Sequence, residues 1–269
     1  MLFFVERIIV ASGVGAHPNA PRIASEVIDL TNPDVKCDPL QDFSRMFATG
    51  GLLPKDKPVI CGGISNEDHE KVLQNCIIID DDPTTSTSNL VMSTERAFAS
   101  SVVLSNGKLW ITGGGNADND RGLNTTEYIF SDMDDPNSGR SSILPDFGPE
   151  LPYPMAGHCL ALLNDLNDVL IIGGKIVVDS SGEEMISNKI FAAAPIDTNQ
   201  IDEIKLQLDT KRMDHSCGVI YNDIAPLVIV AGGITREGDE FPYLDSVEII
   251  APTINVHQKG KKICITYES

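Results

Sequence analysis

The sequence predicts an all-β chain built from one four-stranded unit that is repeated along its length. The first observation is a short apolar run that ends in two small residues, usually Gly-Gly. The second is the spacing, because the first small residue of each pair falls at positions 12, 62, 113, 173 and 232. A period of about 50 residues is typical of propeller blades, whose sheets pack face to face around an axis. The five runs are IIVASG (8–13), PVICGG (58–63), LWITGG (109–114), VLIIGG (169–174) and VIVAGG (228–233).

The best-formed unit, residues 212–250, shows how each element is predicted. Its apolar runs at 217–221 and 227–231 are separated by Asn222 and Asp223, which indicates two neighbouring strands joined by a turn. Gly232 and Gly233 then let the backbone leave the strand at positive φ. A polar loop follows, and residues 246–250 are rich in β-branched side chains, as expected of a third strand.

The other units repeat this order in two further registers. Arg45-Met46-Phe47-Ala48 and Arg96-Ala97-Phe98-Ala99 both begin 17 positions before the first glycine of their pair. Third-strand patterns begin 14 to 16 positions after it, at 26–29, 76–79, 127–130, 189–192 and 248–250. A fourth, less regular segment follows, for example at 88–92, 142–144 or 204–208. Each unit therefore predicts four antiparallel strands.

These patterns resemble kelch repeats. The shared features are the double glycine after an apolar strand, a Glu or its equivalent before the third strand, and Met with His or Arg ahead of the first strand. The resemblance covers almost the whole chain and implies a single kelch-type β-propeller domain over residues 1–269, with four-stranded blades. The chain departs from the family in placing its one Trp, Trp110, in a second strand. It also has five repeat units, four with Gly-Gly and the first with Ser12-Gly13, where six blades are more familiar, so we expect five or six blades, in a complete or an incomplete ring.

The two ends of the sequence leave the closure of the ring open. Too little chain precedes Arg7 for a full first strand, and residues 254–269 extend beyond the third strand of the fifth unit. In one interpretation the tail strand, residues 262–267, joins the first blade and closes the ring. In the other, the propeller is open and lacks a blade.

Composition restricts the classes of partner. The formal net charge is −19, from 39 acidic and 20 basic residues, which argues against nucleic acid and anionic membranes as partners. Runs of 18 apolar residues are absent, so no membrane-spanning helix is expected. The start, MLFFVERIIV, lacks a basic region and favours a strand over a signal peptide, hence a cytoplasmic protein. A truncated N-terminus would leave an extracellular location open.

The cysteines predict one disulfide. The six cysteines show no CxxC or Cys/His ligand spacing, so we predict neither a metal site nor a cofactor. Cys61 precedes the glycine pair of the second unit, and Cys76 opens its third strand. Antiparallel neighbours of this kind can lie within disulfide range, and we predict a Cys61–Cys76 bridge.

The other cysteines are predicted to be free or paired only conditionally. Cys159 and Cys217 fall in the innermost strands of their units, where we expect buried free thiols. Cys37 and Cys264 would pair only if the tail closes the first blade. The cysteine count alone does not decide between an oxidising and a reducing compartment.

We predict a non-enzymatic module that presents loops to a protein partner, because no P-loop, nucleophile elbow or HExxH motif is present. The segment before the first strand and the loop after the glycine pair should emerge at the same end of the ring, where loops on a rigid scaffold carry binding residues. The candidates are Arg45, Arg96, His158 and His215 before first strands, with Asn66, Asp118 and Arg236 after glycine pairs. The alternative is a secreted propeller that binds a glycan or small molecule, or acts on one, in an axial pocket.

Overall fold

The computed structural model describes residues 7–11, 25–29, 37–39, 45–65, 71–79, 87–116, 122–130, 146–178, 182–221, 225–251, 253–259 and 262–268. In residues 7–39, 87–89 and 253–268 only the backbone is described. The described chain is almost entirely β-structure, with one short 3-10 turn, η1 (Pro54–Asp56). Within it, no helix has the length and apolar character needed to cross a membrane.

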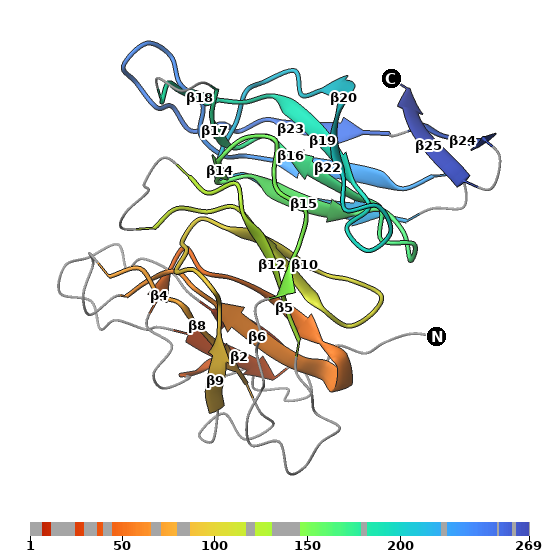
Figure 1. The fold of residues 1–269 in the computed structure, drawn as a ribbon. Coiled ribbons are helices and arrows are strands. Elements are labelled where there is room, and N and C mark those ends of the chain that lie inside the picture. The colour runs from red at the N-terminus through yellow and green to blue at the C-terminus, as the bar shows by residue number, and fades with distance from the viewer. Residues whose placement is uncertain are drawn as a thin grey trace.

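Five antiparallel sheets follow one another along the chain (Figure 1), and we number them in that order. Sheet 1 contains β1 (Arg7–Ala11), β2 (Ser25–Asp29) and β3 (Cys37–Pro39). Sheet 2 contains β5 (Thr49–Leu53), β6 (Lys57–Cys61), β8 (Asn75–Ile78) and β9 (Thr87–Val91), and sheet 3 contains β10 (Ser100–Val103), β11 (Leu109–Thr112), β12 (Thr126–Ile129) and β13 (Asp146–Phe147). Sheet 4 contains β15 (Cys159–Leu162), β16 (Val169–Ile172), β19 (Lys189–Ala193) and β20 (Ile201–Gln207), and sheet 5 contains β21 (Ser216–Ile220), β22 (Leu227–Ala231) and β23 (Val247–Ile250).

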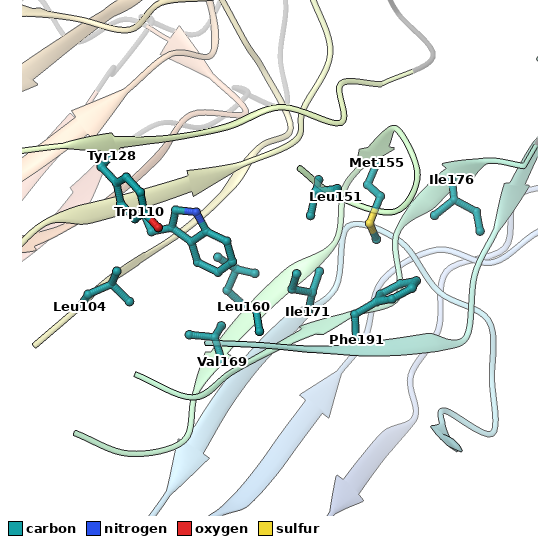
Figure 2. Packing of buried hydrophobic residues seen from close by; sticks show 11 residues of the cluster. Leu104, Trp110, Tyr128, Leu151, Met155, Leu160, Val169, Ile171, Ile176 and Phe191 are labelled. Atoms are coloured by element: carbon teal, nitrogen blue, oxygen red, sulfur yellow. The ribbon is translucent and has the colours of Figure 1, made fainter. Parts of the chain in front are cut away.

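Sheets 2 to 5 pack face to face, and their innermost strands are neighbours. Strand β5 contacts β10, β10 contacts β15, and β15 contacts β21. Between sheets 3 and 4, the buried side chains of Trp110 and Tyr128 pack with Leu160 and Phe191 (Figure 2). Burying one such side chain contributes about 1.5–3 kcal/mol. The arrangement is propeller-like, as the sequence predicts.

At one end of sheets 2 to 5, the segment that leads into each innermost strand pairs with the segment after the glycine pair. In sheet 2, β4 (Arg45–Met46) pairs with β7 (Ile64–Ser65). In sheet 4, β14 (Met155–Ala156) pairs with β17 (Lys175–Val177), which pairs with β18 (Glu184–Ile186). These short strands lie on the left of Figure 1. We call them the lead-in end, and the predicted placement of both segments at one end is confirmed.

The tail does not close the first sheet. Strand β25 (Lys262–Glu268) exists where a tail strand was predicted, but it pairs with β24 (Thr253–Lys259) rather than with sheet 1. A pairing between neighbouring segments closes a short loop, which costs less chain entropy than a pairing with a strand more than 200 residues away. The side chains of Cys37 and Cys264 lie outside the described residues.

Two disulfides are present in the described chain. Cys61 and Cys76 face each other on β6 and β8 and are bonded, as predicted. Cys159 and Cys217 also form a disulfide, so the prediction of free thiols was wrong. Their innermost strands, β15 and β21, belong to successive sheets, and packing brings the two Cα atoms to 6.1 Å. This distance lies in the range that a disulfide requires.

Candidate functional site

Four residues at the same repeat position form a row across successive sheets at the lead-in end. Phe47, Phe98, Gly157 and Asp214 each lie two residues before an innermost strand, and all have positive φ, between 53° and 65°. The Phe98 N–H donates to the Phe47 carbonyl at 3.0 Å, and Gly157 donates to Phe98 at 2.9 Å. Asp214 donates to Gly157 at 2.8 Å. Because the innermost strands lie nearest the axis, we call this row the axial row.

The backbone conformation of the axial row is unusual for its side chains. Positive φ is rare for a bulky residue such as Phe, and it costs on the order of 1–3 kcal/mol. Gly157 occupies the same position without this penalty. Strained conformations of this kind are concentrated at binding and catalytic sites. The axial row is therefore our candidate site.

The side chains of the axial row combine an aromatic pair with a carboxylate. The rings of Phe47 and Phe98 stack with centroids 4.0 Å apart, and Phe47 remains 44% exposed. A Cβ on Gly157 would lie 2.5 Å from Oδ1 of Asp214, so the carboxylate occupies the space that the glycine leaves. Partial burial raises the pKa of Asp214, while the charge of Lys175 acts in the opposite direction. The site thus offers an apolar face and an acceptor.

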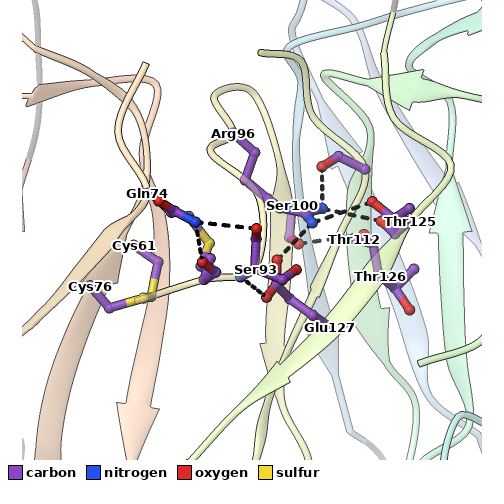
Figure 3. A network of polar contacts seen from close by, with 12 residues as sticks. Cys61, Gln74, Cys76, Ser93, Arg96, Ser100, Thr112, Thr125, Thr126 and Glu127 are labelled. Atoms are coloured by element: carbon purple, nitrogen blue, oxygen red, sulfur yellow. Dashed lines mark hydrogen bonds and ion pairs between the residues drawn. A yellow bond between two sulfur atoms is a disulfide. The ribbon is translucent and has the colours of Figure 1, made fainter. Parts of the chain in front are cut away.

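Close to the axial row, buried arginines join the segments of single sheets. Nη1 of Arg96 donates to the carbonyls of Gly113 and Thr125, and Nη2 forms an ion pair with Glu127 at 2.7 Å (Figure 3). The other oxygen of Glu127 accepts the N–H of Ser93 at 2.7 Å. The guanidinium therefore joins the lead-in segment, the glycine pair and the third strand of one sheet.

Arg45 makes the same backbone contacts in sheet 2, to Gly62 and Asn75. Ile77 stands where sheet 3 has its carboxylate, and burial lowers the pKa of Arg45 to about 10. Burial also lowers the pKa of Arg96, against the opposing effect of Glu127. Arg45 is 3% exposed and Arg96 is 1% exposed. Their burial contradicts the prediction that they contact a partner, because both guanidinium groups are used within the fold.

The two candidate histidines are also buried. Nε2 of His158 lies 2.7 Å from Oγ1 of Thr112, and burial lowers the pKa of His158 to about 3. Burial lowers the pKa of His215 to about 4. Each ring packs against the first glycine of the preceding sheet's pair, Gly113 for His158 and Gly173 for His215. Both are packing residues, neutral at pH 7, and the prediction that they contact a partner does not fit their burial.

The remaining candidates are the loop residues. Arg236 is exposed, and its guanidinium lies 5.8 Å from the ring centroid of Phe241. It borders a cavity of about 270 Å³ lined by Glu184, Met185, Ile186, Lys211, Thr235, Arg236 and Gly238. Asn66 and Asp118 lie outside the described residues. Arg236 is thus the one predicted contact that the described residues place on the surface.

Sequence reasoning missed Phe47, Phe98 and Asp214 as site residues. Their signal is the third position of the aligned lead-in segments RMFA, RAFA, MAGH and RMDH (45–48, 96–99, 155–158 and 212–215), where two phenylalanines and an aspartate replace the glycine that the backbone favours. Among the described residues, no group of three or more His, Cys, Asp or Glu side chains is placed to hold a metal ion. The candidate site is therefore built from an aromatic pair and one carboxylate.

No known protein-family description matches the sequence, and no curated protein matches it. Among solved structures, 168 chains match the fold. One of them, described as "Structure of YjhT", superposes with a TM-score of 0.67 at 16% identity, over 91% of this chain and 78% of that chain. At this identity the likeness concerns the fold alone. Together with the five sheets, it supports an all-β, propeller-like architecture.

Proposed function

We propose that the chain is a kelch-type propeller that binds a small ligand at the axial row. The observation that supports this proposal is the placement of two phenylalanines at positive φ in the same hydrogen-bonded row as Asp214. Gly157 fills the same backbone position in sheet 4, so the fold itself does not require an aromatic residue there. A ligand that stacks on Phe47 would explain why phenylalanine occupies this strained backbone position.

A small glycan is the ligand class that uses both parts of the site. The C–H face of a sugar ring packs on the exposed face of Phe47, and its hydroxyl groups donate to the Asp214 carboxylate. Successive backbones in the row are joined by hydrogen bonds at about the 4.8 Å spacing of paired strands, so Phe47 and Asp214, three steps apart, are separated by about 14 Å. This separation suits two or three sugar rings.

We further propose that the site binds without catalysing a reaction. His158 and His215, the acid–base candidates at this end, are buried, and their pKa values of about 3 and about 4 keep them uncharged at pH 7. Efficient acid–base catalysis requires a group with a pKa near the working pH and contact with the substrate. Arg45, Arg96 and these histidines are buried, so four of the residues expected to contact a protein partner cannot do so. This favours the ligand-binding alternative.

The test is a glycan array followed by titration calorimetry of each binder. We expect Asp214→Asn and Phe47→Ala each to weaken binding at least about tenfold, because each removes one half of the site. Asp165→Asn and Phe147→Ala are matched controls, since both residues are exposed on other parts of the surface. The proposal fails if no sugar binds, or if the site variants behave like the controls. If simple amines bind and sugars do not, the glycan proposal is wrong and the axial row binds amines.

A further inference from the structure

Sheet 5 leaves one of its faces uncovered. In β21, β22 and β23, more exposed residues alternate with less exposed ones, whereas β16 of sheet 4 is buried on both faces. The uncovered face carries Ile220, Val247 and Ile249, which are 51%, 59% and 67% exposed. Cross-strand pairs of Ile229 with Ile249 and of Ala231 with Val247 make this face continuous.

The glycine pairs show what covers the corresponding face of the other sheets. A Cβ on Gly62, Gly113 or Gly173 would lie 2.2 to 2.7 Å from a carbonyl of the next unit's lead-in segment. For Gly232 of sheet 5, the nearest such atom is the Leu244 carbonyl of the same unit, at 3.7 Å. Sheet 4 packs on one face of sheet 5, and no unit among the described residues packs on the other face.

Among the described residues, sheet 5 also has no outer strand. Sheets 2, 3 and 4 each have a fourth strand, β9, β13 or β20, whereas β23 is the last strand of sheet 5 among the described residues. The next strand, β24, pairs with β25 instead. The outer edge of β23 thus presents backbone N–H and C=O groups of the kind that accept an added strand.

Charge and area both point to a particular occupant. The rim of sheet 5 carries four exposed acids, Glu237, Asp239, Glu240 and Asp245, against two exposed bases, Arg236 and Lys211. An acidic rim attracts a basic partner, and the net charge of −19 makes a second copy of this chain unfavourable.

The uncovered face is too small for a stable dimer. Three strands of about five residues span roughly 16 by 14 Å, or about 220 Å² in projection. A stable interface buries about 800 Å² on each partner. A single extended segment, which gains main-chain hydrogen bonds at the edge in addition to this face, needs far less area.

We propose that sheet 5 binds an extended, basic segment of a partner protein as a fourth strand beside β23. Alternate apolar side chains of the segment pack beside Val247 and Ile249 on the same face of the sheet, and its Lys or Arg side chains contact the acidic rim. Strand β20 holds the equivalent place in sheet 4, which shows the geometry that the added strand adopts.

The probe is a fluorescent peptide copied from β20, IDEIKLQ, with the residues equivalent to Asp202 and Glu203 changed to lysine. We expect it to bind the full chain, more weakly as salt rises, and to slow hydrogen exchange in residues 247–250. The unaltered acidic peptide should bind at least about tenfold more weakly, because its charge matches that of the rim. A peptide with proline at the position of Ile204 should also bind weakly, since proline removes a ladder hydrogen bond.

Ile249→Glu is the matching protein variant, and Leu166→Glu is its control, because both side chains are 67% exposed. We expect the first to reduce peptide affinity about tenfold or more and the second to leave it unchanged. The proposal is overturned if Ile249→Glu binds normally, or if protection appears away from β23. It is also overturned if β23 is already protected in the free chain, or if sedimentation detects a dimer that Ile249→Glu dissociates.

Discussion

The buried pair Arg96 and Glu127 provides the sharpest test of how one repeat position is filled. Each of sheets 2 to 5 has a residue at the start of its lead-in segment and a partner position on its third strand. The strand pairings place the partner at the same position in every sheet, but the residues differ from sheet to sheet. The four pairs are Arg45/Ile77, Arg96/Glu127, Met155/Phe191 and Arg212/Glu248. We predict that in sheet 3 the two charges stabilise the fold only as a pair.

The magnitude follows from the contacts. In Arg96→Met the Glu127 carboxylate, 1% exposed, loses its ion pair at 2.7 Å and keeps only the N–H of Ser93. In Glu127→Ile the buried guanidinium loses its counter-charge. Breaking one side of a buried pair costs about 3–5 kcal/mol. The double variant buries no charge, and Met and Ile both occur at these positions elsewhere in the chain, so it should cost less than the sum of the single variants by at least about 2 kcal/mol.

Urea unfolding followed by the fluorescence of Trp110 is the assay, because the single tryptophan of the chain is buried in sheet 3. Unchanged m-values should accompany the shifts in midpoint. The Arg212/Glu248 cycle is the matched control and should show weaker coupling, since the Glu248 side chain is 15% exposed. If the sheet 3 substitutions are additive within about 0.5 kcal/mol, the pair is not an energetic unit and the reasoning fails.

Three further predictions concern stability. Ile77→Glu should place a carboxylate beside Arg45 and raise the free energy of unfolding by up to about 1 kcal/mol, measured by urea unfolding. A large loss of stability would show that Ile77 is needed for packing. The lowered pKa values of His158 and His215 stabilise the fold fully above about pH 6.5, and this contribution falls with pH, by about 2 kcal/mol per histidine between about pH 6.5 and 5. Gln at both positions should flatten that pH profile of urea unfolding, and an unchanged slope would contradict the assignment. Because 58 residues separate Cys159 from Cys217, Cys159→Ala should cost about 4 kcal/mol in oxidised protein, and equal losses under reducing conditions would refute a disulfide contribution.

The sheets were predictable from the sequence because their signals are local. The apolar run 227–231, its flanking Gly232 and the β-branched run 246–250 lie within one unit, and the structure forms β22 and β23 there. The Cys61–Cys76 bridge was predictable for the same reason, since both cysteines belong to neighbouring strands of one sheet.

Contacts between units were not predictable in this way. The Cys159–Cys217 disulfide depends on how closely two innermost strands approach, and no local pattern reports that distance. Arg96 was expected at the surface because an arginine is rarely buried without several partners. Its partners, the carbonyls of Gly113 and Thr125 and the Glu127 carboxylate, become apparent only when the three strand registers are superposed.

Phe47→Gly tests whether Phe47 serves ligand binding or the stability of the fold. Glycine relieves the positive φ of Phe47 by on the order of 1 kcal/mol, while it loses a similar amount in stacking on Phe98 and in unfolded-chain entropy. The free energy of unfolding in urea should therefore change by no more than about 1 kcal/mol, as the glycine at position 157 of the same row implies. Calorimetry should nonetheless show the affinity for a sugar identified on the array falling about tenfold or more. A stability loss above about 2 kcal/mol would instead assign Phe47 to packing, and the strained backbone would then need no ligand to explain it.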